Sequence, residues 1–357
     1  MISYFTKMYQ AVPALSQLQQ ALGGSFVSTR RSTLAAIRRN YPHSQTAKLS
    51  RLLPQHSAGL QVLKQSSLIV TGSPNNAILK TLPAKKIMVF HGTYAPFSVE
   101  EAHAMAHFDQ LCVIGSRMME VVTQAGLAHK ATYTGYLPFL ENPQKNAAAR
   151  TKFLTSLGLD PAKKTVLYLP AGRPIGSWDF LAEKLVRELS NEFNLILRPH
   201  PSHAVTARLK DTLGFFKLQQ LIKKRGNAYL DLTAQKLAYL FAHGDVVLSD
   251  ATSPAEESLY YDLPQVFVET PKYSQGHAQQ VLVNKNIAAT HIKKVMQIYD
   301  CGLALSIEKD NTNKVIDAAL AGSNTFFEAR QAYFNYVFGA RDFNAQHALI
   351  ASLRQYA

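Results

Sequence analysis

The sequence predicts an α/β protein with two Rossmann-like lobes, whose parallel sheets face a central cleft. Short apolar runs that end at a glycine or a polar residue alternate with amphipathic stretches, which is typical of parallel strands wrapped by helices. A length of 357 residues fits about two domains of roughly 150 residues each. Hydrophobic residues make up 47% and charged residues 17% of the chain, so two packed cores can form.

The N-terminal lobe is predicted over residues 1–145. Residues 1–21 have a loosely amphipathic pattern that we interpret as a packed helix. Beyond it, short apolar runs predict buried strands, and a helix is predicted over residues 117–125. These strands are expected at residues 66–72, 85–92, 110–116 and 131–136. A segment with proline and asparagine over residues 141–150 is suited to a linker.

The C-terminal lobe is predicted over residues 146–315 by the same alternation. Its strands are expected at residues 164–170, 193–201, 246–250 and 265–269, and its helices at residues 151–157, 178–190 and 233–242. Residues 316–357 are rich in aromatic residues and have a helical pattern. We expect them to form C-terminal helices that pack across the lobes.

Positive charge is concentrated in the N-terminal part of the chain. Lysine and arginine number 38 against 24 acidic residues, a net charge of +14. The first 99 residues hold eleven of these basic residues and no acidic one. An acid-free lobe should attract phosphates, nucleic acid or an anionic lipid surface. A basic surface that serves only solubility is the alternative. A transit peptide fits poorly, because the acid-free run continues through predicted core strands.

Other features of the composition restrict the class of protein. No run of eighteen apolar residues occurs, so the sequence contains no obvious membrane-spanning helix. The two cysteines, Cys112 and Cys301, are too few for a disulfide scaffold or a cysteine zinc site, which favours a reducing, cytoplasmic setting. A nucleic-acid-binding protein is suggested only by the charge, because no recognition motif is present, and we expect no nucleic-acid partner.

Chemically unusual residues follow four of the predicted strands. Ligands of such two-lobed proteins bind at the carboxyl ends of parallel strands, so these residues form the candidate site. Each motif also has a structural interpretation, as a turn, a proline-fixed loop or an ordinary helix N-cap. The glycine patterns of dinucleotide folds and P-loops are absent, so NAD and ATP-type phosphate sites are not expected. The motifs are His91-Gly92-Thr93, Arg173 in L-P-A-G-R-P, Arg198-Pro199-His200-Pro201, and the segment from Asp250 to Glu257.

In this order the motifs resemble those of the CDP-glycerol:poly(glycerophosphate) glycerophosphotransferases of teichoic-acid synthesis and their capsule relatives. The resemblance covers residues 85–345. It departs from the family pattern where no lysine closely follows H-G-T, where Gly172 replaces an aromatic residue, and where Thr252 replaces a serine. The matching positions are H-G-T at 91–93, T-G-Y at 134–136, Pro170 and Arg173 of a loose A-P-T-x-R, R-P-H-P at 198–201, and Asp250, Thr252, Ser253 and Glu257 of D-x-S-S-x-x-x-D/E.

The resemblance implies a GT-B fold and a phosphotransferase. Such an enzyme moves a glycerol-phosphate or related alditol-phosphate unit from a CDP-activated donor, such as CDP-glycerol, to a hydroxyl of a cell-surface glycan or polymer, and CMP is released. No cofactor and no protein-bound metal are expected, because no Asp-x-Asp cluster lies near the motifs.

The resemblance also implies a role for each matching residue. His91 is expected to be a catalytic base, since the pKa of histidine suits proton removal from an acceptor hydroxyl. Gly92 and Thr93 are expected to bind substrate beside it. His200, the second expected catalytic residue, would stabilise the charge of the departing CMP. The other expected substrate-binding residues are Arg173, Arg198, Asp250, Thr252, Ser253 and Glu257, the last holding a ribose hydroxyl.

An acceptor that can be lipid-linked implies a cytoplasmic protein held peripherally at the membrane. Basic residues clustered in the sequence would contact an anionic lipid surface, although they could instead grip a polyanionic acceptor chain. The expected group is Arg30, Arg31, Arg38, Arg39, Lys48 and Arg51.

Two other enzymes with the same lobes stay open as alternatives. One is a GT-B glycosyltransferase that uses a nucleotide sugar. The other is a hydrolysing UDP-sugar 2-epimerase, whose acidic pair could correspond to Glu256 and Glu257. The motifs R-P-H-P and H-G-T favour the glycerophosphotransferase.

Overall fold

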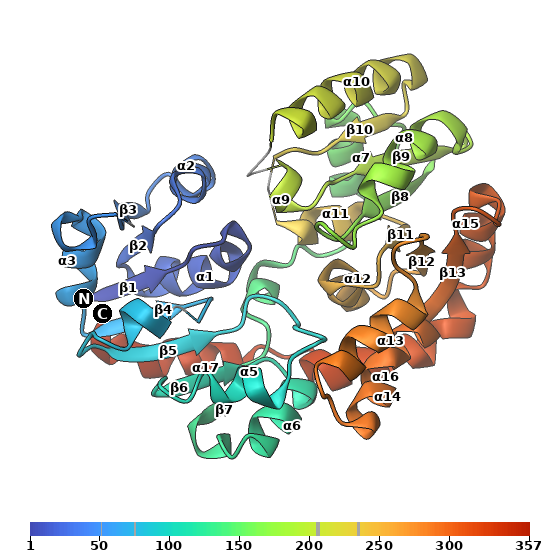
Figure 1. The fold of residues 1–357 in the computed structure, drawn as a ribbon. Coiled ribbons are helices and arrows are strands. Elements are labelled where there is room, and N and C mark those ends of the chain that lie inside the picture. The colour runs from blue at the N-terminus through green and yellow to red at the C-terminus, as the bar shows by residue number, and fades with distance from the viewer. Residues whose placement is uncertain (51, 75, 205–207, 234–235) are drawn as a thin grey trace. The chain divides into compact units, whose positions relative to one another are not determined.

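The computed structural model describes residues 1–50, 52–74, 76–204, 208–233 and 236–357, and the chain divides into two compact units (Figure 1). Unit 1 comprises Met1–Glu141 and Asn335–Ala357, and unit 2 comprises Asn142–Phe334. The first change of unit lies at the start of the predicted linker. The second lies within helix α16 (Phe327–Phe338), so the segment that follows belongs to unit 1.

Unit 1 contains a seven-stranded parallel sheet in the order β3-β2-β1-β4-β5-β6-β7. Its central strands are buried, as expected for a parallel sheet covered on both faces by helices. The strands are β1 (Ile2–Phe5), β2 (Ser25–Ser28), β3 (Gln45–Lys48), β4 (Leu68–Thr71), β5 (Lys85–Val89), β6 (Gln110–Val113) and β7 (Ala131–Tyr133). The helices are α1 (Val12–Leu22), α2 (Arg31–Asn40), α3 (Ala58–Lys64), α4 (Asn76–Leu79), α5 (Val99–His103), α6 (Ser116–Gln124) and α17 (Asn344–Leu353).

The prediction of one packed helix over residues 1–21 is wrong. Ile2–Phe5 forms the central strand β1, and the α-helix begins only at Val12. The apolar side chains of β1 are buried on both faces of the sheet, so they lack the alternation that marks a half-buried strand. Pro13 at the start of α1 is the local signal for where the helix begins.

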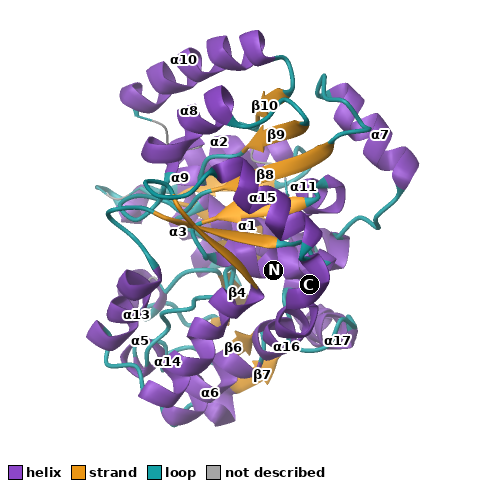
Figure 2. Ribbon diagram, turned by 90° about the vertical axis from the view of Figure 1, so that its right-hand side faces the viewer, coloured by secondary structure: helices purple, strands orange, loops and turns teal. Residues whose placement is uncertain are grey.

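Unit 2 contains a six-stranded parallel sheet in the order β10-β9-β8-β11-β12-β13. Helices α8 and α10 pack side by side against its β8–β10 half (Figure 2). The strands are β8 (Lys164–Leu169), β9 (Phe193–Leu197), β10 (Ala228–Leu230), β11 (Val246–Ser249), β12 (Gln265–Glu269) and β13 (Gly302–Ser306). The helices are α7 (Ala147–Ser156), α8 (Trp178–Glu188), α9 (Pro201–Ala204), α10 (Leu209–Arg225), α11 (Leu237–His243), α12 (Ser253–Ser258), α13 (Gln275–Asn284), α14 (Ala289–Met296) and α15 (Thr312–Ala321).

These two sheets confirm the predicted α/β class. Each predicted strand is present, and α7, α8 and α11 overlap the three helices predicted for unit 2, whereas the helix α10 was not predicted. In each sheet the strand order reverses once, between β1 and β4 in unit 1 and between β8 and β11 in unit 2. A crevice forms at the carboxyl ends of the strands where the order reverses, and ligands of open α/β sheets bind there.

Residues 335–357 complete unit 1. The Tyr133 hydroxyl, on the edge strand β7, donates a hydrogen bond of 2.8 Å to the Phe338 carbonyl oxygen. A side chain at Gly115 would collide with the carbonyl group of Val337, so this close approach of the two backbones requires glycine. Helix α17 then runs along the strands β5 and β6, as Figure 1 shows in red.

Candidate functional site

His91 lies two residues beyond the end of β5 in unit 1, and its hydrogen bonds determine its tautomer. Its Nδ1 atom is 2.6 Å from the carbonyl oxygen of Gly72, which follows β4. A carbonyl oxygen can only accept, so Nδ1 carries the proton and Nε2 carries the lone pair. Burial lowers the pKa of His91 to about 4, against the opposing effect of this hydrogen bond. The ring is therefore neutral near pH 7, with a basic nitrogen at Nε2.

Two neighbouring side chains donate hydrogen bonds to the backbone of the H-G-T turn. The buried Arg117 donates from Nη2 to the Thr93 carbonyl oxygen at 2.7 Å. The hydroxyl of Tyr136, the last residue of T-G-Y, donates to the His91 carbonyl oxygen at 3.3 Å. The structure thus brings together the H-G-T and T-G-Y motifs. Gly92 lies half-buried in the same turn, whereas the Thr93 side chain is buried.

Tyr94 is part of this site, although nothing in the sequence marked it. Its hydroxyl oxygen lies 2.8 Å from Nδ1 and 3.2 Å from Nε2 of His91, and the two rings meet edge-on. Its backbone has a φ of 50°, a left-handed conformation that non-glycine residues seldom adopt. Such residues gather at functional sites, so the φ angle is a signal that only the structure could provide.

His200 in unit 2 has the opposite tautomer. Its Nδ1 atom accepts a hydrogen bond of 3.1 Å from the backbone N–H of Ser202, so the proton lies on Nε2. Burial, aided by His203, lowers the pKa of His200 to about 4, and the neutral ring offers an N–H donor. A β-carbon on Gly172 would lie 2.8 Å from Nδ1 of His200. The absence of an aromatic residue at position 172 therefore leaves room for the His200 ring.

Both arginines expected to bind the donor are held by aspartates. Arg198 Nη1 lies 2.9 Å from Oδ2 of Asp231, and both side chains are nearly buried. The guanidinium of Arg173 forms an ion pair with Asp211, which His203 also approaches. These aspartates follow their arginines by more than thirty residues in the chain. No local pattern in the sequence could have revealed the pairing.

Asp250 supports the loop that carries Gly172 and Arg173. Its buried carboxylate accepts hydrogen bonds from the backbone N–H groups of Ala171, at 2.6 Å, and Ser177, at 3.0 Å. Burial raises the pKa of Asp250, while these bonds oppose the rise. The structure therefore places Asp250 behind the loop, where it orients the loop's backbone.

Beyond Asp250 the chain turns into α12. Ala251 has a φ of 51°, a second left-handed residue at the end of a strand, and Thr252 is the N-cap of the helix. Ser253 is its first residue, and Glu257 is half-buried one turn on. The neighbouring Glu256 is buried and accepts a hydrogen bond of 2.8 Å from the Tyr333 hydroxyl, which gives that carboxylate a structural role.

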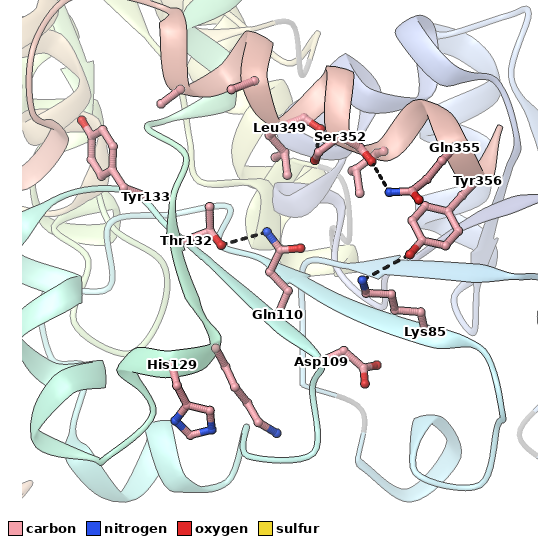
Figure 3. A pocket seen from close by; sticks show the side chains of 14 residues that line it. Lys85, Asp109, Gln110, His129, Thr132, Tyr133, Leu349, Ser352, Gln355 and Tyr356 are labelled. Atoms are coloured by element: carbon pink, nitrogen blue, oxygen red, sulfur yellow. Dashed lines mark hydrogen bonds between the residues drawn. The ribbon is translucent and has the colours of Figure 1, made fainter.

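A pocket of about 480 Å³ lies in unit 1, at the end of the sheet opposite the carboxyl ends of the strands (Figure 3). It opens at the amino ends of β5–β7 beside α17, so it contains none of the predicted site residues. Several of its polar side chains bond to other groups of the protein: Lys85 donates to the Tyr356 hydroxyl, Gln110 to Thr132, and Lys130 to two carbonyl oxygens. The bond from Lys85 to Tyr356 connects the sheet to the segment that follows α17, and the other bonds lie within the β6–β7 part of unit 1.

Within the described ranges, no group of three or more His, Cys, Asp or Glu side chains is arranged to hold a metal ion. None of the helices formed by the described residues is long and apolar enough to cross a bilayer.

Solved structures resemble this fold, although no protein-family model and no curated protein matches the sequence. The wall teichoic acid polymerase TagF aligns with a TM-score of 0.66 at 13% identity, over 99% of this chain and 88% of that one. A TagF histidine variant soaked with CDPG gives a TM-score of 0.65 at 15% identity, with the same coverage. HepE from Anabaena, in complex with UDP-glucose, gives 0.54 at 13% identity, over 100% and 99% of the chains. The chain thus has the GT-B type of α/β fold, and its resemblance to the teichoic-acid polymerases is confirmed at the level of the fold.

Proposed function

We propose that the protein transfers a glycerol-phosphate or related alditol-phosphate unit from a CDP-activated donor to a hydroxyl of a glycan or polymer acceptor, with release of CMP. The observation that carries this proposal is the pair of opposite histidine tautomers. His91 offers a lone pair at Nε2, which suits a base, and His200 offers an N–H at Nε2, which suits an anion. The likeness to TagF soaked with CDPG supports the choice of donor.

In the proposed reaction, His91 activates the acceptor. The acceptor hydroxyl donates its proton to Nε2 while its oxygen forms a bond to the alditol-bearing phosphorus. The bond from that phosphorus to the CMP oxygen breaks, and CMP leaves with the electron pair. His91 afterwards releases its proton to solvent. A base placed in this way contributes typically 10²–10⁴-fold in rate.

In the proposed reaction, groups of unit 2 stabilise the negative charge of the departing CMP. The Nε2–H of His200 and the guanidiniums of Arg173 and Arg198 stabilise the developing anion in this proposal. Asp211 and Asp231 hold the two guanidiniums in fixed orientations, so little reorganisation is needed when the donor binds. Thr252, Ser253 and Glu257 contact the nucleotide. The reaction as written requires no cofactor and no protein-bound metal.

The second candidate is a glycosyltransferase that uses a nucleotide sugar. The likeness to HepE in complex with UDP-glucose favours it. The two candidates differ in the leaving group, which is CMP for the first and UDP for the second. The roles proposed for His91 and His200 are the same in both reactions. The donor that the protein accepts therefore distinguishes the two candidate functions.

A donor panel tests the proposal. The purified protein is incubated with CDP-glycerol, CDP-ribitol, UDP-N-acetylglucosamine or UDP-glucose, with a polymer acceptor, and released CMP and UDP are measured. CMP release that depends on acceptor and is lost in His91→Ala and His200→Ala supports the proposal. His129→Ala and His277→Ala, which remove exposed histidines of units 1 and 2, are matched controls. UDP release without CMP release would favour the glycosyltransferase.

The proposal extends to attachment at an anionic membrane surface on the cytoplasmic side. Arg51 lies outside the described residues, and Arg30 is half-buried. Leu52 and Leu53, which follow β3, are 91% and 65% exposed. An anionic bilayer attracts basic side chains to its surface and accommodates exposed apolar side chains. The exposed basic residues of the group are Arg31, Arg38, Arg39 and Lys48.

Flotation with vesicles tests the membrane surface. The protein should float with anionic vesicles at low salt without acceptor, and high salt should release it. Arg38→Glu/Arg39→Glu and Leu52→Asp/Leu53→Asp should each reduce flotation. Lys223→Glu/Lys224→Glu, in unit 2, changes the net charge by the same amount as the arginine pair and serves as its control. If the wild type stays unbound at low salt, the basic group serves the acceptor chain or solubility instead.

A further inference from the structure

The end of helix α16 lies against both side chains that donate hydrogen bonds to the H-G-T turn. These donors are Arg117, which bonds to the Thr93 carbonyl oxygen at 2.7 Å, and Tyr136, which bonds to the His91 carbonyl oxygen at 3.3 Å. They come from different elements, α6 and the segment after β7. What they share is a neighbouring segment much later in the chain, which the proposed reaction does not use.

Tyr336 provides the contact near Arg117. Its hydroxyl donates a hydrogen bond of 3.2 Å to Oε2 of Glu120, which lies one turn after Arg117 on α6. Burial and Glu120 raise the pKa of Tyr336, whereas Arg117 lowers it, so both charges lie near the phenol. Arg117 is 3% exposed, and a buried guanidinium keeps its place only while the polar groups around it are fixed. Tyr336 therefore helps to fix the Arg117 side chain.

Phe338, two residues further on, packs against Tyr136. The centroids of these two rings are 5.4 Å apart, and the Phe139 centroid lies 4.9 Å from each of them. The three residues are at most 6% exposed, so none of the rings can shift without leaving a void. The Phe338 carbonyl oxygen also accepts the bond from Tyr133, which holds the backbone of this segment. Phe338 therefore fixes the direction in which the Tyr136 hydroxyl points.

The H-G-T turn has to be placed accurately for His91 to act as a base. The proton of His91 lies on Nδ1 because that atom is 2.6 Å from the Gly72 carbonyl oxygen. A displacement of the turn weakens this bond, and a misplacement of about 1 Å can cost on the order of 10²-fold in rate. Arg117 and Tyr136 bond to the carbonyl oxygens of the last and first residues of the turn, so together they fix both of its ends.

We propose that Tyr336 and Phe338 are positioning residues for His91. Tyr336 acts through Arg117, and Phe338 acts through Tyr136. Together they hold the turn where His91 keeps its proton on Nδ1 and its lone pair on Nε2. The inference rests on the proposed function for the role of His91 as a base, whereas the placement of the ring is a property of the free protein.

The tautomer of His91 in the free protein tests the role of Tyr336. In protein labelled with ¹⁵N-histidine, the wild type should give an unprotonated Nε2 resonance for His91, assigned by its loss in His91→Gln. Tyr336→Phe should shift this resonance toward that of a protonated nitrogen, because the bond at Nδ1 is weakened. Tyr133→Phe is the matched control, since it removes a hydroxyl that bonds to the same segment but not to the residues that hold the turn. An unchanged resonance in Tyr336→Phe overturns the role of Tyr336.

Phe338→Leu tests the second contact by the same measurement. It should shift the His91 resonance, because Tyr136 loses the ring that it packs against. Phe334→Leu shortens another buried ring of α16, which packs against Tyr260 in unit 2, and should leave the resonance in place. Tyr136→Phe keeps every ring and removes only the bond to His91, so it should give the shift even if Phe338→Leu does not fold. An unchanged resonance in Tyr136→Phe or in folded Phe338→Leu overturns the role of Phe338.

Kinetics test whether Tyr336 acts through Arg117. With a donor that supports transfer, Tyr336→Phe should lower kcat about 10-fold at unchanged donor KM, the effect of one hydrogen bond to a charged group. In an Arg117→Met background the same substitution should have no further effect, because the residue that it acts through is gone. Equal losses in both backgrounds would overturn the action through Arg117. If no donor of the panel supports transfer, the proposed function fails, while the His91 spectra still decide whether Tyr336 and Phe338 position the ring.

Discussion

The Nη1 atom of Arg198 lies 2.9 Å from Oδ2 of Asp231, so this guanidinium is oriented before any donor arrives. The side chains are 10% and 5% exposed, which leaves neither charge well solvated without the other. Asp231 also accepts hydrogen bonds from the backbone N–H and the hydroxyl of Thr233. The carboxylate therefore connects the end of β9 to the chain beyond β10, and Arg198 depends on it.

The first prediction follows from this pair. Asp231→Ala should lower the free energy of unfolding by about 3–5 kcal/mol, because it leaves a nearly buried guanidinium without its counter-charge. It should also weaken CDP binding, since Arg198 loses its orientation. Urea unfolding and calorimetric titration with CDP measure the two effects. Asp300→Asn removes an exposed carboxylate of the same unit and should change neither. Unchanged CDP affinity in a folded Asp231→Ala protein would remove Arg198 from the donor site.

The second prediction concerns Gly172. Gly172→Ala places a methyl group 2.8 Å from Nδ1 of His200, so the ring must move away from its bond with Ser202. The rate should fall on the order of 10²-fold, as when one preorganised donor to a developing anion is lost. Gly214→Ala in α10 is the matched control, because nothing lies within 4 Å of its added methyl group and a helical alanine is favoured over glycine by about 1 kcal/mol. Full activity in Gly172→Ala would contradict a catalytic His200.

A third prediction separates two substitutions of Asp250. Asp250→Ala removes the acceptor for two backbone N–H groups and should cost about 2–4 kcal/mol of stability. Asp250→Asn keeps an acceptor oxygen in place and should cost roughly half as much or less. Urea unfolding gives both values. Equal losses would mean that the negative charge, and not the acceptor oxygen, holds the loop.

The fourth prediction is the pH dependence of stability. Burial lowers the pKa of His91 and His200 to about 4, whereas both titrate at about 6.5 in the unfolded chain. Between these values the unfolded state binds more protons, so stability is fully present above about pH 6.5 and falls as the pH drops toward 4. Urea midpoints across this window should decrease for the wild type and decrease less for His91→Ala/His200→Ala. His107, His203 and His243, whose pKa is also lowered by burial, contribute to the slope that remains.

The lowered pKa of His91 also predicts how the activity depends on pH. The neutral form of His91 persists down to about pH 4, so kcat should stay flat from neutral pH to near pH 5 and fall below it. The initial rate at saturating donor and acceptor, at several pH values, measures this limb. A half-maximal rate near pH 6.5 would mean that the base is an ordinary solvated histidine.

Parallel sheets made much of this fold predictable. A buried parallel strand is a short apolar run with a breaker at its end, and the runs that end before His91, Arg198 and Asp250 could be recognised on that basis. Strand β3 could not, because Gln45–Lys48 is polar and partly exposed at a sheet edge. The central strand β1 could not either, because Ser3 interrupts its short apolar run and its apolar residues continue into the pattern of the helix that follows.

For each interaction in the site, the motif residue could be predicted from the sequence but its partner could not. The motif residues lie where strands end, so His91 and His200 could be named from the sequence. Their partners depend on the three-dimensional fold: Gly72 precedes His91 by 19 residues, and Asp231 follows Arg198 by 33. Nothing in the sequence marks Tyr94 as a site residue, because its left-handed backbone angle and its contact with His91 are properties of the folded chain.

The return of residues 335–357 to unit 1 has a consequence for synthesis on the ribosome. Strand β7 is made about 200 residues before α17, which at roughly 5–20 residues per second corresponds to a delay of about 10–40 s. During that time the nascent unit 1 carries the surface that Leu349 and Leu353 later cover. Unit 2, whose chain is continuous, can fold while unit 1 waits. A chaperone that binds exposed apolar surface would therefore find its target in the half of the protein that is made first.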